Sequence, residues 1–112
     1  MEKELQRLLY TKGSFRHYRG FTYFIEAVIL AHENPERLHH ICKELYLPVA
    51  STFGTDMRTV EKDIRHFRDA FIKSDGGALL AEISGATCWH HKSPFPREMI
   101  EIFVYYLENY TR

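Results

Sequence analysis

The stretch from Ala50 to Phe71 constrains the fold more than any other, because it predicts two helices separated by a tight turn. Gly54 predicts the end of the first helix, since glycine enters left-handed backbone space at little cost. Thr55 or Asp56 can cap the second helix with a side-chain oxygen. Apolar residues then recur at spacings of three and four, which places them on one face of an amphipathic helix over about 57–72. They are Met57, Val60, Ile64, Phe67 and Phe71.

Charged side chains occupy most of the other face of this predicted helix. They are Arg58, Glu61, Lys62, Arg65 and Arg68. A helix, a short turn with glycine and a second helix with outward arginines make the helix-turn-helix pattern. An ordinary helical hairpin with a solvated charged face gives the same pattern, because short helix pairs are common in all-α domains. The pattern alone leaves both interpretations open.

The rest of the chain also predicts helices, and no segment shows the alternation of a strand. We expect helices at residues 2–11, 21–32, 35–46, 48–53, 78–83 and 96–109. Pro48 either kinks the third of these or opens a new turn, and the helix that follows is expected to bury Val49 and Phe53. Residues 73–77 are expected to form a loop, with the glycine pair ending the long helix. The prediction is an all-α domain of about six helices over residues 1–112.

The last predicted helix is apolar nearly all round. From Met99 to Leu107 only Glu101 is polar, apart from two tyrosine hydroxyls. A helix packed on one core needs an apolar arc of only a little over about 100°. Either this helix is central to the fold, or its second face meets another chain.

Composition limits the classes of function. The chain has 112 residues and a formal net charge of zero, so charge distribution must carry any argument for nucleic acid. Cys42 and Cys88 lie outside any CxxC pair, which predicts free thiols in a reducing compartment. The N-terminus has no signal-peptide pattern and no run is long enough to span a membrane, so we expect a cytoplasmic location and no membrane contact.

The sequence contains no motif typical of a metal site or of an enzyme active site. His39-His40 and His90-His91 are adjacent pairs, and Cys88 and His90 are too close for the usual zinc spacing. No glycine-rich phosphate loop, nucleophile elbow or HExxH is present. We therefore expect no metal, no cofactor, no small-molecule substrate and no catalysis. Trp89 either covers the core beneath its loop or contacts DNA or a partner.

Four segments together resemble a known family. They are Arg19 to Val28, Ile41 to Ala50, Phe53-Gly-Thr and Val60-Glu-Lys-Asp-Ile-Arg-His66. They resemble the C-terminal DNA-binding effector domain of stage-zero sporulation protein A, a response regulator of spore-forming bacteria. The resemblance covers nearly all of the chain. It implies a six-helix effector domain that binds duplex DNA sequence-specifically in transcriptional control of sporulation, with the helix near 57–72 in the major groove.

The resemblance also implies which positions contact DNA. Carried over residue by residue, they are Arg58, Glu61, Lys62, Arg65 and His66. Arginine suits the task because its fork can meet both guanine acceptors in the major groove. Arg68 lies on the same predicted charged face, and we expect it to bind DNA as well. His17 and Arg19, just before a helix N-terminus, are candidates for phosphate contact.

Asp63, which stands where a small neutral residue is more usual, and the zero net charge favour an alternative. The chain is then a protein-interaction module of the same fold, with weak or no DNA binding, that pairs with a full-length regulator. This sequence also has no receiver-domain pattern ahead of the motif, so we expect either an excised piece of a longer regulator or a stand-alone effector. Either function is compatible with a homodimer or a mixed pair formed through the last helix. The target sequence, the direction of regulation, the oligomeric state and whether the chain is a fragment of a longer regulator stay open.

Overall fold

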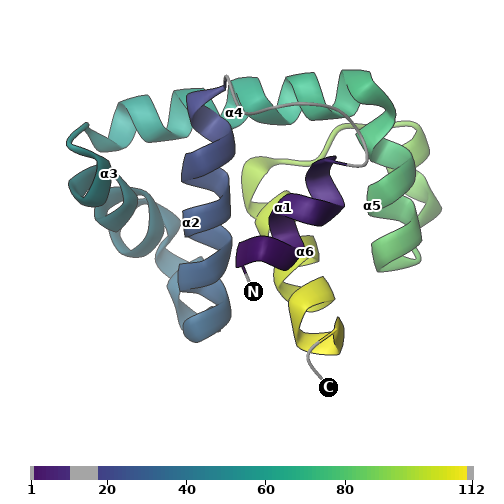
Figure 1. The fold of residues 1–112 in the computed structure, drawn as a ribbon, viewed down its shortest axis with the longest axis horizontal. Coiled ribbons are helices and arrows are strands. Elements are labelled where there is room, and N and C mark those ends of the chain that lie inside the picture. Colours follow the sequence, from purple (N-terminus) through teal and green to yellow (C-terminus); the bar gives the residue numbers. More distant parts are fainter. Residues whose placement is uncertain (1, 11–17, 111–112) are drawn as a thin grey trace.

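The computed structural model describes residues 2–10 and 18–110, and these contain helices and turns but no strand. The predicted all-α class and helix-turn-helix are confirmed, with six α-helices in the described ranges (Figure 1). The α-helices are α1 Glu2–Tyr10, α2 Arg19–Glu33, α3 Leu47–Phe53, α4 Met57–Phe71, α5 Gly77–Ser84 and α6 Pro96–Tyr110. Four shorter helical segments of other kinds connect them: η1 Pro35–His40, η2 Cys42–Tyr46, η3 Ile72–Gly76 and η4 Thr87–His90.

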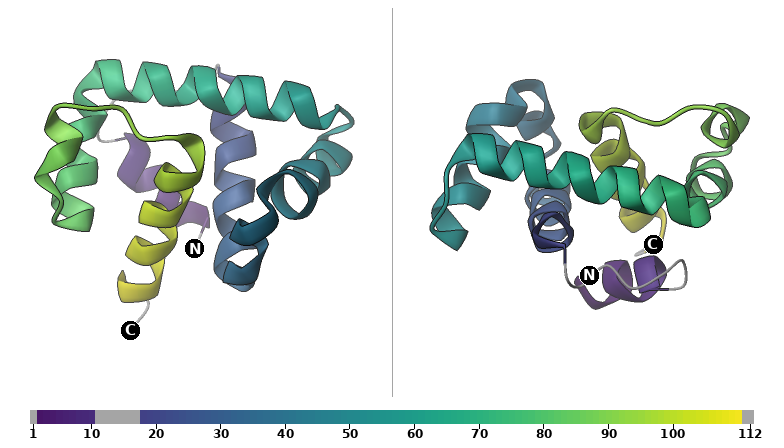
Figure 2. Two further views of the ribbon diagram at one scale, coloured as in Figure 1. Left: turned by 180° about the vertical axis from the view of Figure 1, so that it is seen from behind. Right: turned by 90° about the horizontal axis from the view of Figure 1, so that it is seen from above.

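Helix α4 forms the top of the molecule. It runs across one end of α2 and α6, which descend from it side by side (Figures 1 and 2). Helix α3 lies beside one end of α4 and α5 beside the other, while α1 covers the front. One long face of α4 is therefore free of other helices.

Four phenylalanines join the three central helices. Phe24 of α2 lies 5.3 Å from Phe67 of α4 and 5.5 Å from Phe103 of α6, measured between ring centroids. Phe71 closes the group at 6.1 Å from Phe67 and 6.2 Å from Phe103. All four side chains are fully buried, and such tilted or edge-on pairs are favourable beyond the area they bury. This cluster anchors the inner face of α4.

The inner face of α4 follows the predicted spacing except at its first residue. Val60, Ile64, Phe67 and Phe71 are fully buried, whereas Met57 is 37% exposed. The prediction that the preceding helix, α3, buries Phe53 is wrong, because this side chain is 41% exposed. Met57 lies in the first turn of α4, at the edge of the core. Phe53 packs at the surface against Tyr23 of α2, with ring centroids 5.4 Å apart.

The segment from Pro35 to Tyr46 is helical as predicted, but it is not an α-helix. Asn34 accepts the backbone N–H of Glu36 and begins a tight 3-10 segment, which leads into a wider π-helical turn. At the end of that turn the Leu47 N–H bonds to the carbonyl of Cys42, five residues back. Pro48 has no N–H and its ring crowds the preceding turn, so a widened turn lets the chain pass into α3. Pro48 thus begins a new helix without a break.

The paired glycines act differently from the prediction of a loop at residues 73–77. The chain stays helical except for a kink at Ser74 and Asp75, and Asp75 rather than a glycine adopts the left-handed conformation, with φ 66°. Gly76 and Gly77 are needed for close packing instead. A Cβ atom at Gly76 would overlap the Phe71 ring, and one at Gly77 would overlap the Trp89 carbonyl.

Helix α6 is apolar on most sides because it lies at the centre of the fold. Its buried side chains are Met99, Ile100, Ile102, Phe103, Val104 and Leu107. Tyr105, at 54% exposure, is its one large apolar residue on the outer surface of the described part.

Trp89 is buried under its loop, as the core interpretation predicts. None of the described helices is long and apolar enough to cross a membrane.

Candidate nucleic-acid interface

The start of α4 is built by the turn that precedes it. Gly54 has the predicted left-handed conformation, with φ 67°, and the Thr55 N–H bonds back to the Ala50 carbonyl at 2.9 Å. Asp56 is the N-cap, and its carboxylate accepts the Thr59 N–H at 2.8 Å. This hydrogen bond stabilises the ionised form and lowers the pKa of Asp56 below its usual value. The geometry of a helix-turn-helix is therefore present between α3 and α4.

The outward face of α4 carries a row of cationic side chains. Arg58, Lys62, Arg65 and His66 are exposed. Successive residues of an α-helix are separated by about 100°, so these four share one arc of the helix surface. That arc lies opposite the buried face and has no helix over it (Figure 2). These predicted positions are thus brought together on one accessible surface.

Glu61 holds one of these cations. Its carboxylate accepts a hydrogen bond from Arg65 at 2.7 Å, one turn further along α4. The two side chains are 42% and 50% exposed, so solvent screens the pair and its contribution to stability is small. Its structural effect is to restrict the orientation of the Arg65 guanidinium.

Arg68 points away from this surface, although the sequence places it on the charged face. Its side chain is only 15% exposed. Nη1 donates to the Pro94 carbonyl at 3.1 Å, in the segment before α6, and Nη2 donates to Asp69 at 2.9 Å. Arg65 therefore remains on the exposed surface of α4, whereas the Arg68 side chain is engaged by other parts of the protein.

Asp63 lies on the flank of α4 that faces α2. It precedes Arg65 by two positions, so the two side chains diverge by about 160°. Asp63 is half-buried, and its backbone carbonyl is where Gly20 of α2 meets α4. A Cβ atom at position 20 would overlap that carbonyl, so only glycine permits this approach. Asp63 thus lies away from the centre of the cationic surface.

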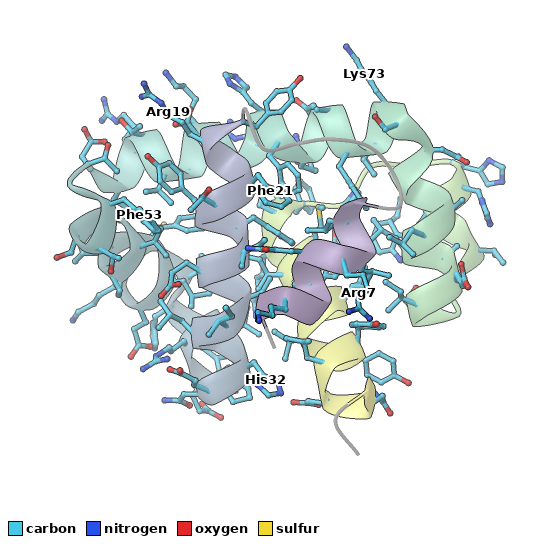
Figure 3. All side chains as sticks on the ribbon, viewed as in Figure 1. Arg7, Arg19, Phe21, His32, Phe53 and Lys73 are labelled. Atoms are coloured by element: carbon cyan, nitrogen blue, oxygen red, sulfur yellow. The ribbon has the colours of Figure 1, made fainter. Side chains whose placement is uncertain are left out.

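Arg19 lies where α2 begins, beside the end of α4 that follows the turn (Figure 3). It is exposed, and it lines a hollow of about 440 Å³ together with Phe53, Gly54 and Thr55. Arg19 is therefore adjacent to the turn of the helix-turn-helix. The other predicted phosphate contact, His17, lies outside the described residues.

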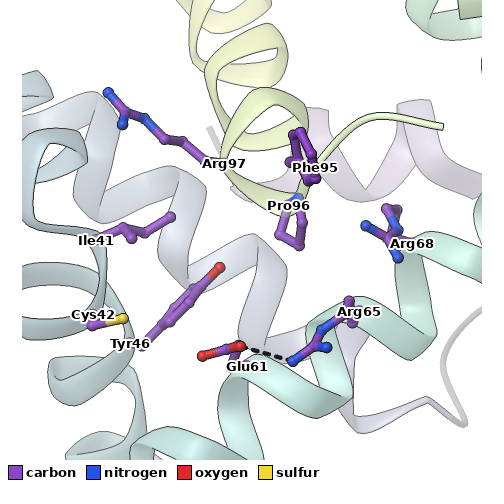
Figure 4. Close-up of a pocket in the computed structure, with 9 residues that line it drawn as sticks. All are labelled: Ile41, Cys42, Tyr46, Glu61, Arg65, Arg68, Phe95, Pro96 and Arg97. Carbon is purple, nitrogen blue, oxygen red and sulfur yellow. Dashed lines mark hydrogen bonds and ion pairs between the residues drawn. The ribbon is translucent and has the colours of Figure 1, made fainter. Parts of the chain in front are cut away.

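A groove of about 490 Å³ follows the opposite flank of α4, between η2 and the start of α6 (Figure 4). Arg65, Arg68 and Arg97 line it together with the apolar side chains of Phe95 and Pro96. Burial, and next the charge of Glu61, raise the pKa of the Tyr46 hydroxyl at this groove. Sequence reasoning missed the groove because its walls come from three distant segments with no shared periodicity.

The described residues offer no obvious metal site. Within residues 2–10 and 18–110, no three side chains of the histidine, cysteine, aspartate or glutamate type lie close enough to hold an ion. Cys42 and Cys88 are both free and exposed.

Comparison with known families identifies the family to which this chain is similar. A family model described as "Sporulation initiation factor Spo0A C terminal" matches residues 5–107. The matched range covers nearly the whole chain, including the turn, all of α4 and the core helices. It confirms the resemblance seen in the sequence.

Proposed function

The chain belongs to the family of the C-terminal domain of sporulation initiation factor Spo0A, and from this we propose that it reads duplex DNA sequence-specifically through α4. The family is a DNA-binding effector domain of sporulation regulators rather than an enzyme family. One observation carries the finer proposal: α4 follows a capped tight turn and presents Arg58, Lys62, Arg65 and His66 on one open surface. A helix with these dimensions and charges fits the major groove.

The side chains on this surface have distinct proposed roles. Arg65 is suited to a guanine edge, and Glu61 limits the directions in which its fork can point. Arg58 is likewise suited to a base edge, while Lys62 and His66 are suited to phosphates. Arg19, which lies beside the turn, is proposed to meet the phosphate backbone there, and His17 is proposed as a second phosphate contact. Phosphate contacts fix the register of the protein, and base contacts give the sequence preference.

The position of Asp63 supports DNA binding over the alternative protein-interaction module. Its carboxylate lies on the α2-facing flank, where repulsion from phosphates is weaker than it would be at the centre of the surface. The zero net charge of the chain is compatible with binding because Arg58, Lys62 and Arg65 share one open surface of α4, where their local charge can act. The protein-interaction module stays a prediction that the binding experiment decides.

Pairing on DNA is a further part of the proposal. Two copies on adjacent half-sites would gain affinity without extra basic charge. Most apolar side chains of α6 are buried in the core, so any pairing surface on the described part of this helix centres on the exposed Tyr105. Size-exclusion chromatography with light scattering, with and without DNA, tests this. A strict monomer under both conditions would contradict pairing.

The deciding experiment is fluorescence anisotropy with a labelled pool of duplexes, followed by sequencing of the bound fraction. We expect a recovered motif, and affinity that falls steeply with rising salt as counterions are displaced. The Lys62→Ala variant should bind more weakly with a shallower salt dependence. The matched control is Arg7→Ala, which removes an exposed cation from α1, away from α4 (Figure 3). Absence of binding at tens of micromolar protein in low salt would favour the protein-interaction module.

A further inference from the structure

We propose that Arg68 is a positioning residue for DNA recognition, which ties α4 to the start of α6 and does not itself bind phosphate. The inference rests on the proposed function of α4. Its basis is the contact between Arg68 Nη1 and the Pro94 carbonyl at 3.1 Å, which joins residues 26 positions apart in the chain. The carboxylate of Asp69 accepts from Nε at 3.1 Å and from Nη2 at 2.9 Å. All three nitrogens of the guanidinium are thus engaged within the protein.

The segment that receives this contact is itself firmly held. Pro94 is buried, and the Phe95 N–H donates to the Glu98 carboxylate at 2.8 Å. The Phe95 carbonyl accepts from the Met99 N–H at 3.0 Å, and Met99 is fully buried. The Pro94 carbonyl therefore sits at the capped start of a central helix. A hydrogen bond to such a point restrains α4 relative to the core.

Arg68 and Gly20 hold α4 from two sides. Gly20 brings α2 against the Asp63 carbonyl on one flank, and Arg68 reaches the α6 segment on the other. Positions 63 and 68 are about 140° apart around the helix. Lys62, Arg65 and His66 lie on the outward arc between these two contacts. Loss of either contact would let α4 roll about its axis and shift every side chain that faces DNA.

The Arg68 guanidinium is already paired with a carboxylate, which argues against a phosphate contact. Its side chain is mostly covered, and Asp69 beside it compensates the positive charge. To reach a phosphate, the guanidinium would have to give up its bonds to Pro94 and Asp69. Arg65, by contrast, is half exposed on the open surface. Of these two arginines, Arg65 is placed to contact DNA, whereas Arg68 connects α4 to the segment before α6.

The test compares Arg68→Met and Arg68→Lys with Lys62→Ala, using the selected duplex over a range of salt concentrations. Methionine keeps the apolar stem, whereas lysine keeps the charge but cannot span Pro94 and Asp69 with one ammonium group. We expect both Arg68 variants to weaken binding by on the order of tenfold and to broaden the selected motif at several positions. The slope of log affinity against log salt should match that of the unsubstituted protein. For Lys62→Ala that slope should be shallower by about one.

Amide chemical shifts of the free protein provide a readout independent of DNA. Both Arg68 variants should shift the signals of residues 94–99 and of the middle of α4 while thermal melting stays cooperative. A salt slope lowered by about one in Arg68→Met, or full affinity in Arg68→Lys, would overturn the proposal, since each indicates a charge contact. Unchanged affinity and motif in both variants would also overturn it. If the unsubstituted protein binds no duplex, the proposed function fails, and the role of Arg68 in it fails too.

Discussion

At the scale of residues, the direction of a side chain decides its role. Arg65 and Arg68 are the same residue type, one turn apart on the same helix. Arg65 is held by Glu61 on the open surface, whereas Arg68 bonds to the Pro94 carbonyl. The difference arises because the Pro94 carbonyl lies within reach of position 68, whereas position 65 meets Glu61 one turn back and is half exposed. Sequence spacing alone does not separate them.

Replacement of Arg65 by alanine should weaken specific binding by about 1–3 kcal/mol, because a base contact would be lost. The selected motif should lose its preference at one position. Competition anisotropy with the selected duplex measures the change, and Arg7→Ala on α1 controls for loss of one positive charge. Unchanged affinity for Arg65→Ala would remove this residue from the interface.

The N-cap at Asp56 should make stability depend on pH in the acid range. Its pKa is lowered in the folded protein by the bond from the Thr59 N–H, so the stabilisation is complete above the unfolded pKa of about 3.9. It is lost as pH falls through the lower folded value. Thermal melts of the Asp56→Asn variant should therefore lack this part of the acid dependence.

The Asp56→Ala variant serves as its control. Alanine removes the cap acceptor, so the melting temperature should be lower than that of Asp56→Asn near neutral pH. An acid dependence identical in the unsubstituted protein and Asp56→Asn would contradict the assigned role.

At the scale of elements, α4 depends on close approach as well as on burial. Gly20 lets the start of α2 touch the α4 backbone, and Gly76 and Gly77 let the next turn pack on Phe71 and Trp89. None of these three glycines has a left-handed backbone, so space and not conformation selects glycine at them. Steric fit also shapes the segment between Asn34 and Leu47, where a widened helical turn accommodates Pro48 at the start of α3.

Gly20→Ala should lower the free energy of unfolding by about 1–3 kcal/mol, which is the usual cost of overpacking a core. The obstruction is backbone, which yields less than a flexible side chain. Urea unfolding followed by circular dichroism measures the change. Thr22→Ala, at an exposed position in the same turn of α2, is the matched control. A midpoint for Gly20→Ala equal to that of Thr22→Ala would show that α2 can move away without cost.

At the scale of the whole molecule, one contiguous core extends from α1 to α6 and holds α4 against it. The described chain has a radius of gyration of 13.0 Å. Within this core, the four clustered phenylalanines connect α2, α4 and α6, so the orientation of the cationic surface of α4 depends on side chains that never reach it.

Phe103→Ala should destabilise the protein by about 3–5 kcal/mol, because it removes a fully buried ring and leaves a cavity. Phe95→Ala is the matched control, since Phe95 is 73% exposed and its ring fills no space in the core. Chemical unfolding followed by Trp89 fluorescence measures both. Equal stability of the two variants would contradict the central place of Phe103.

The sequence by itself determined what depends on neighbours along the chain. Spacing identified the buried face of α4 from Val60 to Phe71, and residue type identified the turn at Gly54 and limited the cap to Thr55 or Asp56. The same periodicity grouped Arg58, Lys62 and Arg65 on one face, and the family resemblance added His66. These features follow from helix geometry and local hydrogen bonds, which a short window of sequence contains.

Only the tertiary structure decided which features meet across distance. It exposed Phe53 and Met57 at the edge of the core, directed Arg68 to Pro94, and placed Gly20 against the Asp63 carbonyl. It also showed that α6 is apolar because it is central. The physical reason is that burial and close approach depend on segments far apart in the chain, whose relative placement only the packed core establishes.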